Sequence, residues 1–174
     1  MSRLAEMLFR VSAAISLAAG WVAALIMIGM TGLILTEIVL RSFLARSTHI
    51  VEEYVGYGLM TMIFLGLGHS LERGNLIRVD LVVDRLPHGA RRALEVAIAL
   101  VSLAVVGFVA QYVWISMARK LELGTVSMTT AATPLWIPEA IVITGLAVFA
   151  LQLVAYALRL LTGGALVDES ASFE

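Results

Sequence analysis

Four long apolar blocks alternate with short segments that carry nearly all of the charged residues in the chain. The blocks cover residues 11–35, 54–71, 96–118 and 137–161. Roughly 20 apolar residues in a helix cross the hydrocarbon core of a bilayer, so each block can form a transmembrane helix, the second being the shortest. The pattern predicts an all-α integral membrane protein with four transmembrane helices in a single domain over residues 1–174.

The composition also favours lipid over water as the surroundings of these helices. Hydrophobic residues make up 60% of the 174 residues and charged residues 14%, whereas a soluble domain has about 25% charged residues. A net charge of −1 leaves no excess of basic residues for a phosphate backbone, so we expect no nucleic-acid partner. The chain has no cysteine, which excludes disulfides and thiolate metal sites.

The distribution of Lys and Arg predicts the orientation, because cytoplasmic segments retain positive charge. The first block could also be the core of a secretory signal peptide, but it is too long for one, and we expect it to be retained. The two tails and the middle loop carry eight basic residues: Arg3, Arg10, Arg73, Arg78, Arg85, Arg91, Arg92 and Arg159. The first and third loops carry four: Arg41, Arg46, Arg119 and Lys120. Both termini and the middle loop should therefore be cytoplasmic.

The middle loop contains an amphipathic pattern over residues 76–86. Four apolar side chains fall on one helical face and four charged ones on the opposite side: Val79, Val82, Val83 and Leu86 against Arg78, Asp80, Asp84 and Arg85. The alternation over residues 77–81 would also suit a strand, but an isolated strand beside a bilayer leaves its backbone groups unpaired. We therefore predict an interfacial helix between the second and third spans.

Ionisable residues inside a membrane are costly and are the first candidates for function, yet nearly all of them here lie at predicted helix ends. Glu37 has Arg41 one turn later, which predicts an ion pair. Glu52 and Glu53 open the second helix, where they either stabilise the positive end of the helix dipole or contact a partner subunit. Glu139 lies in the first turn of the fourth helix, which fits a helix-terminus role better than proton transfer.

The remaining polar and small residues of the spans indicate helix packing. Gln111, Thr144 and Gln152 lie in the middle of the third and fourth spans, where such groups more often join helices than bind a solute. Three glycine pairs allow close helix approach: Gly29 with Gly32, Gly56 with Gly58, and Gly66 with Gly68.

Catalytic and cofactor-binding motifs are missing from the sequence. A haem within the bilayer generally needs two facing axial ligands, and the three histidines lie in three different regions, so we expect no haem site: His49, His69 and His88. We expect no enzyme activity, no cofactor and no metal site. An independent proton-coupled carrier would need a carboxylate in the centre of the membrane, and the sequence has none. These features indicate a subunit whose partner does the chemistry.

A series of short segments follows in a fixed order through the middle of the chain. They are Glu52-Glu53, Phe64-Leu65-Gly66, Arg73-Gly74-Asn75-Leu76-Ile77-Arg78-Val79-Asp80-Leu81, Leu86-Pro87 with Arg91, Gly124 with Ser127, and Pro134-Leu135-Trp136-Ile137-Pro138. In this order they resemble the small membrane subunit of tripartite ATP-independent periplasmic (TRAP) transporters over about residues 41–161. The family often has Gly-His in place of Asn75-Leu76, and often a proline near residues 143–145.

The resemblance implies one part of a three-part secondary transporter in a bacterial inner membrane, with a large membrane subunit, a periplasmic substrate-binding protein and the lipid bilayer as partners. The large subunit of such systems holds the substrate, typically an organic acid, and moves against a fixed scaffold. We expect this chain to brace that scaffold, with Trp21, Trp114 and Trp136 as interfacial anchors. The charges best placed to dock the binding protein, unless they merely flank the spans, are Arg41, Arg46, Glu52, Glu53, Lys120 and Glu122.

Two other functions are compatible with the sequence. The chain could be the small four-helix subunit of another binding-protein-dependent carrier, such as a tricarboxylate system. It could also be a membrane redox protein whose site carries no recognisable motif. The first alternative differs in partner and the second in chemistry, so both can be tested by what purifies with the chain.

Overall fold

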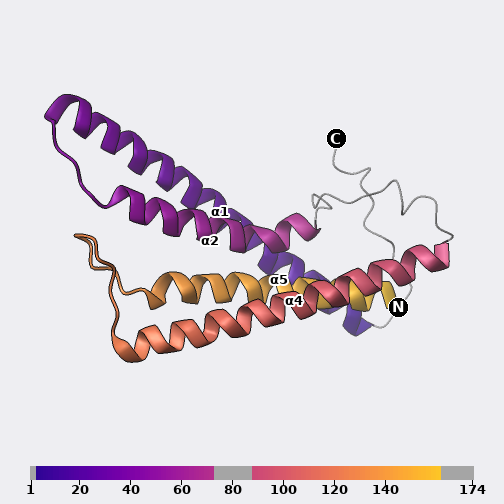
Figure 1. The fold of residues 1–174 in the computed structure, drawn as a ribbon. Helices are drawn as coiled ribbons and strands as arrows, with labels where there is room; N and C mark the ends of the chain where they lie inside the picture. Colours follow the sequence, from indigo (N-terminus) through magenta and orange to yellow (C-terminus); the bar gives the residue numbers. More distant parts are fainter. Residues whose placement is uncertain (1–2, 73–87, 162–174) are drawn as a thin grey trace.

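The structure is a computed structural model that describes residues 3–72 and 88–161, and these residues are helical apart from two connections at one end (Figure 1). The helices are α1 (Arg3–Leu44), α2 (Val51–Glu72), α4 (His88–Leu123) and α5 (Trp136–Leu161). The described ranges contain no strand, only an isolated bridge between Val126 and Pro134. All four helices are long and apolar enough to cross a membrane, so the predicted all-α membrane fold is confirmed.

The interfacial helix predicted over residues 76–86 lies outside the described residues, as do Arg78, Asp80 and Pro87 of the family-like segment. The middle loop therefore stays a prediction. Arg91, which follows it, lies in the first turns of α4.

Two helices are much longer than the apolar blocks that predicted them. α1 has 42 residues and α4 has 36, which at 1.5 Å per residue is about 63 Å and about 54 Å. The predicted spans ended where charges appear, but a charge limits only the part of a helix that lies in hydrocarbon. α2 and α5, with 22 and 26 residues, are close to the thickness of a bilayer.

α5 lies at the centre of the arrangement and packs against each of the other three helices. α1 also packs along α2, whereas the extensive contacts of α4 within the described ranges are with α5 alone. In Figure 1, α1 and α2 form one hairpin and α4 and α5 another, and the two hairpins diverge toward the end where both of them turn. The fold is therefore an open array around α5 and not a closed four-helix bundle.

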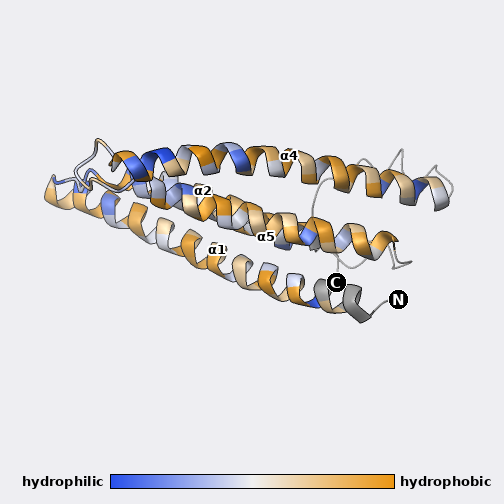
Figure 2. Cartoon of the chain, turned by 90° about the horizontal axis from the view of Figure 1, so that it is seen from below, coloured by the Kyte–Doolittle hydropathy of each residue, from blue (hydrophilic) through white to orange (hydrophobic). Residues whose placement is uncertain are grey.

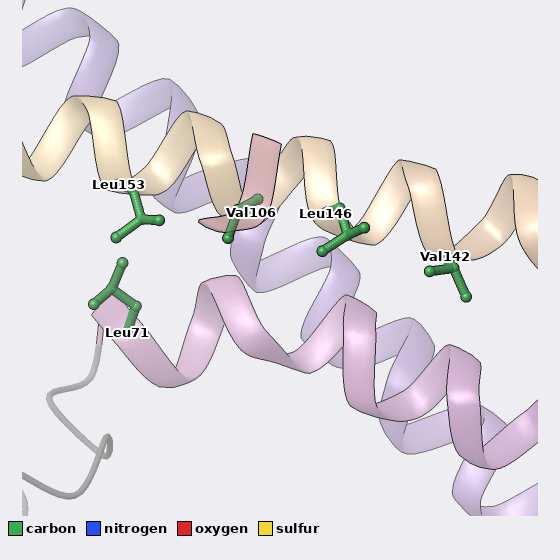
Figure 3. Packing of buried hydrophobic residues seen from close by; sticks show 5 residues of the cluster. All are labelled: Leu71, Val106, Val142, Leu146 and Leu153. Atoms are coloured by element: carbon green, nitrogen blue, oxygen red, sulfur yellow. The ribbon is translucent and has the colours of Figure 1, made fainter. Parts of the chain in front are cut away.

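The buried apolar core follows one face of α5 (Figure 3). Val142, Leu146 and Leu153 of α5 meet Val106 of α4 and Leu71 of α2. Val142 and Leu146 are one helical turn apart, and Leu153 follows about two turns later, which places all three on one side of the helix. A smaller cluster of Ala99, Tyr156 and Leu160 continues this contact toward the C-terminal end of α5.

Glycine allows α2 to approach its neighbours closely at specific positions. A Cβ added at Gly145 of α5 would lie 2.7 Å from the backbone carbonyl carbon of Phe64 in α2, and one at Gly68 of α2 would lie 2.9 Å from Oγ of Ser16 in α1. A Cβ at Gly58 would meet the sulfur of Met30 in α1. Gly58 and Gly68 thus confirm the predicted role of glycine in helix packing.

Four of the glycines expected to allow close approach do not do so within this chain. A Cβ at any of them would meet nothing within 4 Å: Gly29, Gly32, Gly56 and Gly66. These positions lie on helix faces turned away from the neighbouring helices. The sequence pattern could not separate them from Gly58 and Gly68, because the helix face that packs is decided by the tertiary arrangement.

The outer surface of the helices is largely apolar, as lipid contact requires. Figure 2 shows hydrophobic residues along all four helices, with the hydrophilic ones most concentrated near the connections. Phe108 and Tyr112 of α4 are each 72% exposed, and Trp21 and Trp114 are 68% and 57% exposed. Trp136 is half-buried at the first position of α5. All three tryptophans therefore have outward-facing surface for the anchoring role predicted for them.

Candidate functional site

The connection between α1 and α2 is held on a single carboxylate. Glu37, which is 6% exposed, accepts hydrogen bonds from Arg41 Nε (2.7 Å), Ser47 Oγ (2.5 Å) and Thr48 Oγ1 (2.6 Å). The backbone N–H of Thr48 also donates to it, at 3.1 Å. The ion pair predicted between Glu37 and Arg41 is present. Because a buried carboxylate is tolerated only when its lone pairs are used, these bonds fix the path of the connection.

Glu53 joins the start of α2 to the connection between α4 and α5. One of its oxygens accepts a hydrogen bond from Tyr57 Oη at 2.8 Å, and the other accepts one from the hydroxyl of Thr129. Glu53 is half-buried, whereas its neighbour Glu52 is exposed. The same two roles were predicted for both acids, but the structure separates them: Glu53 bonds within the chain, and Glu52 faces outward.

The connection between α4 and α5 is a compact turn with its own hydrogen bonds. The backbone N–H of Ser127 donates to the carbonyl of Thr133 at 2.9 Å, and that of Leu135 donates to the carbonyl of Thr125 at 3.1 Å. The hydroxyl of Ser127 accepts a further bond from the N–H of Thr133 at 3.1 Å. These bonds, together with the Glu53 contact, hold the segment in one conformation.

Gly124 and Met128 mark the beginning and the tip of this turn. Gly124 has φ of 59°, the left-handed conformation that ends many helices and that glycine adopts without strain. This gives a physical reason for the glycine that the family-like pattern contains at this place. Met128 is 105% exposed, so the turn presents a large apolar side chain that touches little of the molecule.

An ion pair ties α4 to α5 at the same end. Lys120 Nζ lies 2.5 Å from Glu139 Oε1, which also accepts a hydrogen bond from Ser116 Oγ at 2.9 Å. The Lys120 and Glu139 side chains are 34% and 16% exposed, and Pro138 before Glu139 is buried. Glu139 therefore does more than the helix-terminus role predicted for it, because it also pairs with Lys120 of the preceding helix. The signal was present in the sequence: opposite charges in the last turn of one helix and the first turn of the next.

The opposite end of the same helix pair is joined by a second polar group. Tyr156 Oη of α5 donates a hydrogen bond to Glu95 Oε2 of α4, and Arg91 Nε lies 3.7 Å from Glu95 Oε1. Glu95 is 8% exposed and Tyr156 5%. Glu95 lies just before the third apolar block, which begins at residue 96, and no local pattern connects it to a tyrosine 61 residues away. The α4–α5 pair is thus joined by polar contacts near both of its ends.

The polar residues predicted to join helices in mid-span differ in placement. Gln152 is buried at 1% exposure. Gln111 and Thr144 are exposed on the outside of the helices, and the Thr144 hydroxyl donates to the carbonyl of Ala140 in its own helix at 2.9 Å. The prediction is therefore wrong for Gln111 and Thr144 within this chain.

The six charges proposed for docking all lie where the two connections meet, and we call this part of the molecule, residues 41–53 and 119–135, the loop end. Arg46, Glu52 and Glu122 are exposed. The other three bond within the chain, although the paired Arg41 side chain remains 57% exposed: Arg41, Glu53 and Lys120. Among the described residues, no three His, Asp or Glu side chains come together in a way that could hold a metal ion.

Comparison with known families agrees with this architecture. The profile of the family described as "Tripartite ATP-independent periplasmic transporters, DctQ component" matches residues 30–163, which include the loop end, α2, α4 and α5. The chain belongs to this family. The resemblance to the small TRAP subunit is thereby confirmed, and the DctQ component is part of a transporter and not an enzyme. A search of curated proteins found no match to the chain.

Proposed function

We propose that this DctQ component braces the large membrane subunit of a TRAP transporter for organic acids, and that its loop end receives the periplasmic substrate-binding protein. The observation that carries the proposal is that Glu37 and Glu53 fasten both connections to the helices, while Glu139 ties α4 to α5 at the same end. A surface held in this way is already in its binding conformation, so a partner loses less entropy when it docks. A subunit that stays still while its partner moves needs the same property.

The open helix array supports the bracing role. Within the apolar window of each span, 44% of the residues of α5 are buried, compared with 11–22% in the other three helices. Much of α1, α2 and α4 is therefore available to lipid or to the helices of a partner. The glycines that meet nothing within this chain, Gly29 and Gly32 on α1 and Gly56 and Gly66 on α2, suit close approach by such helices.

The composition of the loop end supports the docking role. The turn between α4 and α5 has no charged residue from residue 124 to 138, and it exposes Met128 completely. The exposed charges Arg46, Glu52 and Glu122 lie in the flanking segments. Protein interfaces combine an apolar centre with a polar rim, and rim charges mainly set the association rate. The orientation predicted from Lys and Arg places this surface in the periplasm and both termini in the cytoplasm of a bacterial inner membrane.

Purification from native membranes tests the bracing role. A tagged chain extracted in a mild detergent should bring with it a large TRAP membrane subunit, identified by mass spectrometry. Recovery of a tricarboxylate-type large subunit would replace the proposed partner. Recovery of a redox cofactor with no large membrane subunit would contradict the transporter function altogether.

Site-specific photo-crosslinking tests the docking role. A photoreactive amino acid at Met128 should form an adduct with the purified binding protein in membranes that contain the complete transporter. The same amino acid at Phe108, which is exposed on the apolar side of α4, serves as the matched control and should give none. Equal adducts from both positions, or none from Met128 while uptake is intact, would contradict docking at the turn.

A further inference from the structure

Two buried polar side chains at the junction of α1, α2 and α5 have atoms without a hydrogen-bond partner among the residues that the structure describes. Ser16 is 0% exposed and Gln152 1% exposed, and the unpartnered atoms are Ser16 Oγ and Gln152 Oε1. Buried polar atoms in proteins are almost always bonded to protein or to ordered water. A lipid headgroup or a partner subunit cannot reach side chains that are closed off to this extent.

The hydroxyl of Ser16 points away from its own helix. Four threonines of the spans donate instead to the carbonyl one turn earlier, as hydroxyls in helices commonly do: Thr31, Thr36, Thr61 and Thr144. Ser16 makes no such bond. Its Oγ lies 2.9 Å from the position that a Cβ on Gly68 would occupy, so the hydroxyl faces α2.

Gln152 lies on the face of α5 that meets the same junction. Gly145 of α5 contacts the backbone of Phe64, and Val148 Cγ1 lies 3.3 Å from the Cβ position of Gly68. Residues 145, 148 and 152 are separated by three and then four positions, so they share one helix face. Gln152 is therefore one turn beyond the level at which α5 meets Gly68 and Ser16.

The directions of the helices make these two side chains converge. α1 ends at the loop end and α5 begins there, so the two helices run in opposite directions. Side chains in a helix tilt toward its N-terminus. Ser16, at the level of Gly68, tilts away from the loop end, whereas Gln152, one turn further away, tilts back toward it. Both polar groups thus lean toward each other beside Gly68, whose missing side chain is replaced by the close contact of Ser16 and Val148.

We propose that an ordered water molecule lies between α1 and α5 and bridges Ser16 Oγ to Gln152 Oε1. The water donates one hydrogen to the amide oxygen of Gln152, and the hydroxyl of Ser16 either donates to the water or accepts its second hydrogen. Oxygen-bound cations such as Ca²⁺ and Mg²⁺ take about six ligands, and these two side chains supply two. The bridge links α1 to α5 beside Gly68, and it is independent of the transport role proposed above.

A double-mutant cycle on the purified complex tests the bridge. Because Ser16→Ala and Gln152→Leu each remove the same water, either change should lower Tm by about 2–4 °C, and the double variant should lose little more than the larger single loss. Thr144→Ala, which removes a hydroxyl bonded to its own helix, is the control and should change Tm by less. Losses that add fully in the double variant would overturn the proposal.

Two further measurements keep the test decisive if a variant does not fold. A cryo-EM map of the unmodified complex that resolves waters should show density within hydrogen-bond distance of both atoms. An empty space, with the Ser16 hydroxyl turned to its own helix, would overturn the proposal. Replacing sodium by potassium should leave the Tm loss of Gln152→Leu unchanged, and a loss seen only in sodium would indicate a bound cation in place of water.

Discussion

Replacing Tyr156 by Phe tests the hydrogen bond that joins Tyr156 of α5 to Glu95 of α4. The substitution keeps the ring in the cluster with Ala99 and Leu160 and removes only the hydroxyl that donates to Glu95. Hydrogen bonds to charged groups contribute about 1.5–3 kcal/mol, and the substitution removes one such donor from Glu95. Because Glu95 is 8% exposed and keeps Arg91 at 3.7 Å, we expect a loss of about 2 kcal/mol.

The assay is thermal unfolding of the purified complex in detergent, with Tyr112→Phe as the matched control. Tyr112 is also on the α4–α5 hairpin but is 72% exposed, so its hydroxyl should contribute little. A loss of 2 kcal/mol corresponds to a fall in Tm of about 4–8 °C for a chain of this size. A Tyr156→Phe variant as stable as Tyr112→Phe would refute the argument that this buried contact holds α4 to α5.

Three other perturbations follow from the same geometry. Gly145→Ala should lower the free energy of unfolding by about 1–3 kcal/mol because the new methyl overlaps the backbone of α2. Its control is Gly107→Ala, whose methyl meets nothing within 4 Å and which should be neutral or slightly stabilising in the same thermal assay. Glu53→Lys should free the turn of residues 124–135 and speed its cleavage in limited proteolysis. Glu52→Lys should leave that cleavage unchanged, but it should slow the association of the binding protein in stopped-flow measurements. Lys120→Met should lower the free energy of unfolding by about 1 kcal/mol or less, since the Lys120 side chain is 34% exposed, and this loss should shrink at high salt. Equal stability of the two glycine variants, equal behaviour of the two glutamate variants, or a Lys120→Met loss that grows with salt would contradict these contacts.

The apolar blocks were sufficient to predict the helices, because a stretch that must satisfy its backbone in lipid has few other options. The apolar blocks underestimate the lengths of α1 and α4, because a charged residue ends the part of a helix that lies in hydrocarbon and not the helix itself. Glu37 with Arg41 was predictable from a spacing of one turn. Lys120 with Glu139 could also have been found, since consecutive antiparallel helices bring adjacent ends together.

The contacts between distant segments could not be read from the sequence. Thr129 lies 76 residues from Glu53, and neither residue type nor spacing marks them as partners. The same is true of the helix faces: Gly145 packs and Gly107 does not, although both are single glycines in apolar helices. Which face is covered depends on the open arrangement around α5, and that arrangement is a property of all the helices together.

Reconstitution into liposomes tests the central claim most directly. The large subunit, the binding protein and this DctQ component would be purified separately and combined, and uptake of a radiolabelled organic acid would be measured with each one left out in turn. The account predicts uptake only when all three are present, and none from this chain alone. Full uptake without it, or any uptake by it alone, would contradict the view that this subunit braces and docks its partners without carrying the solute itself.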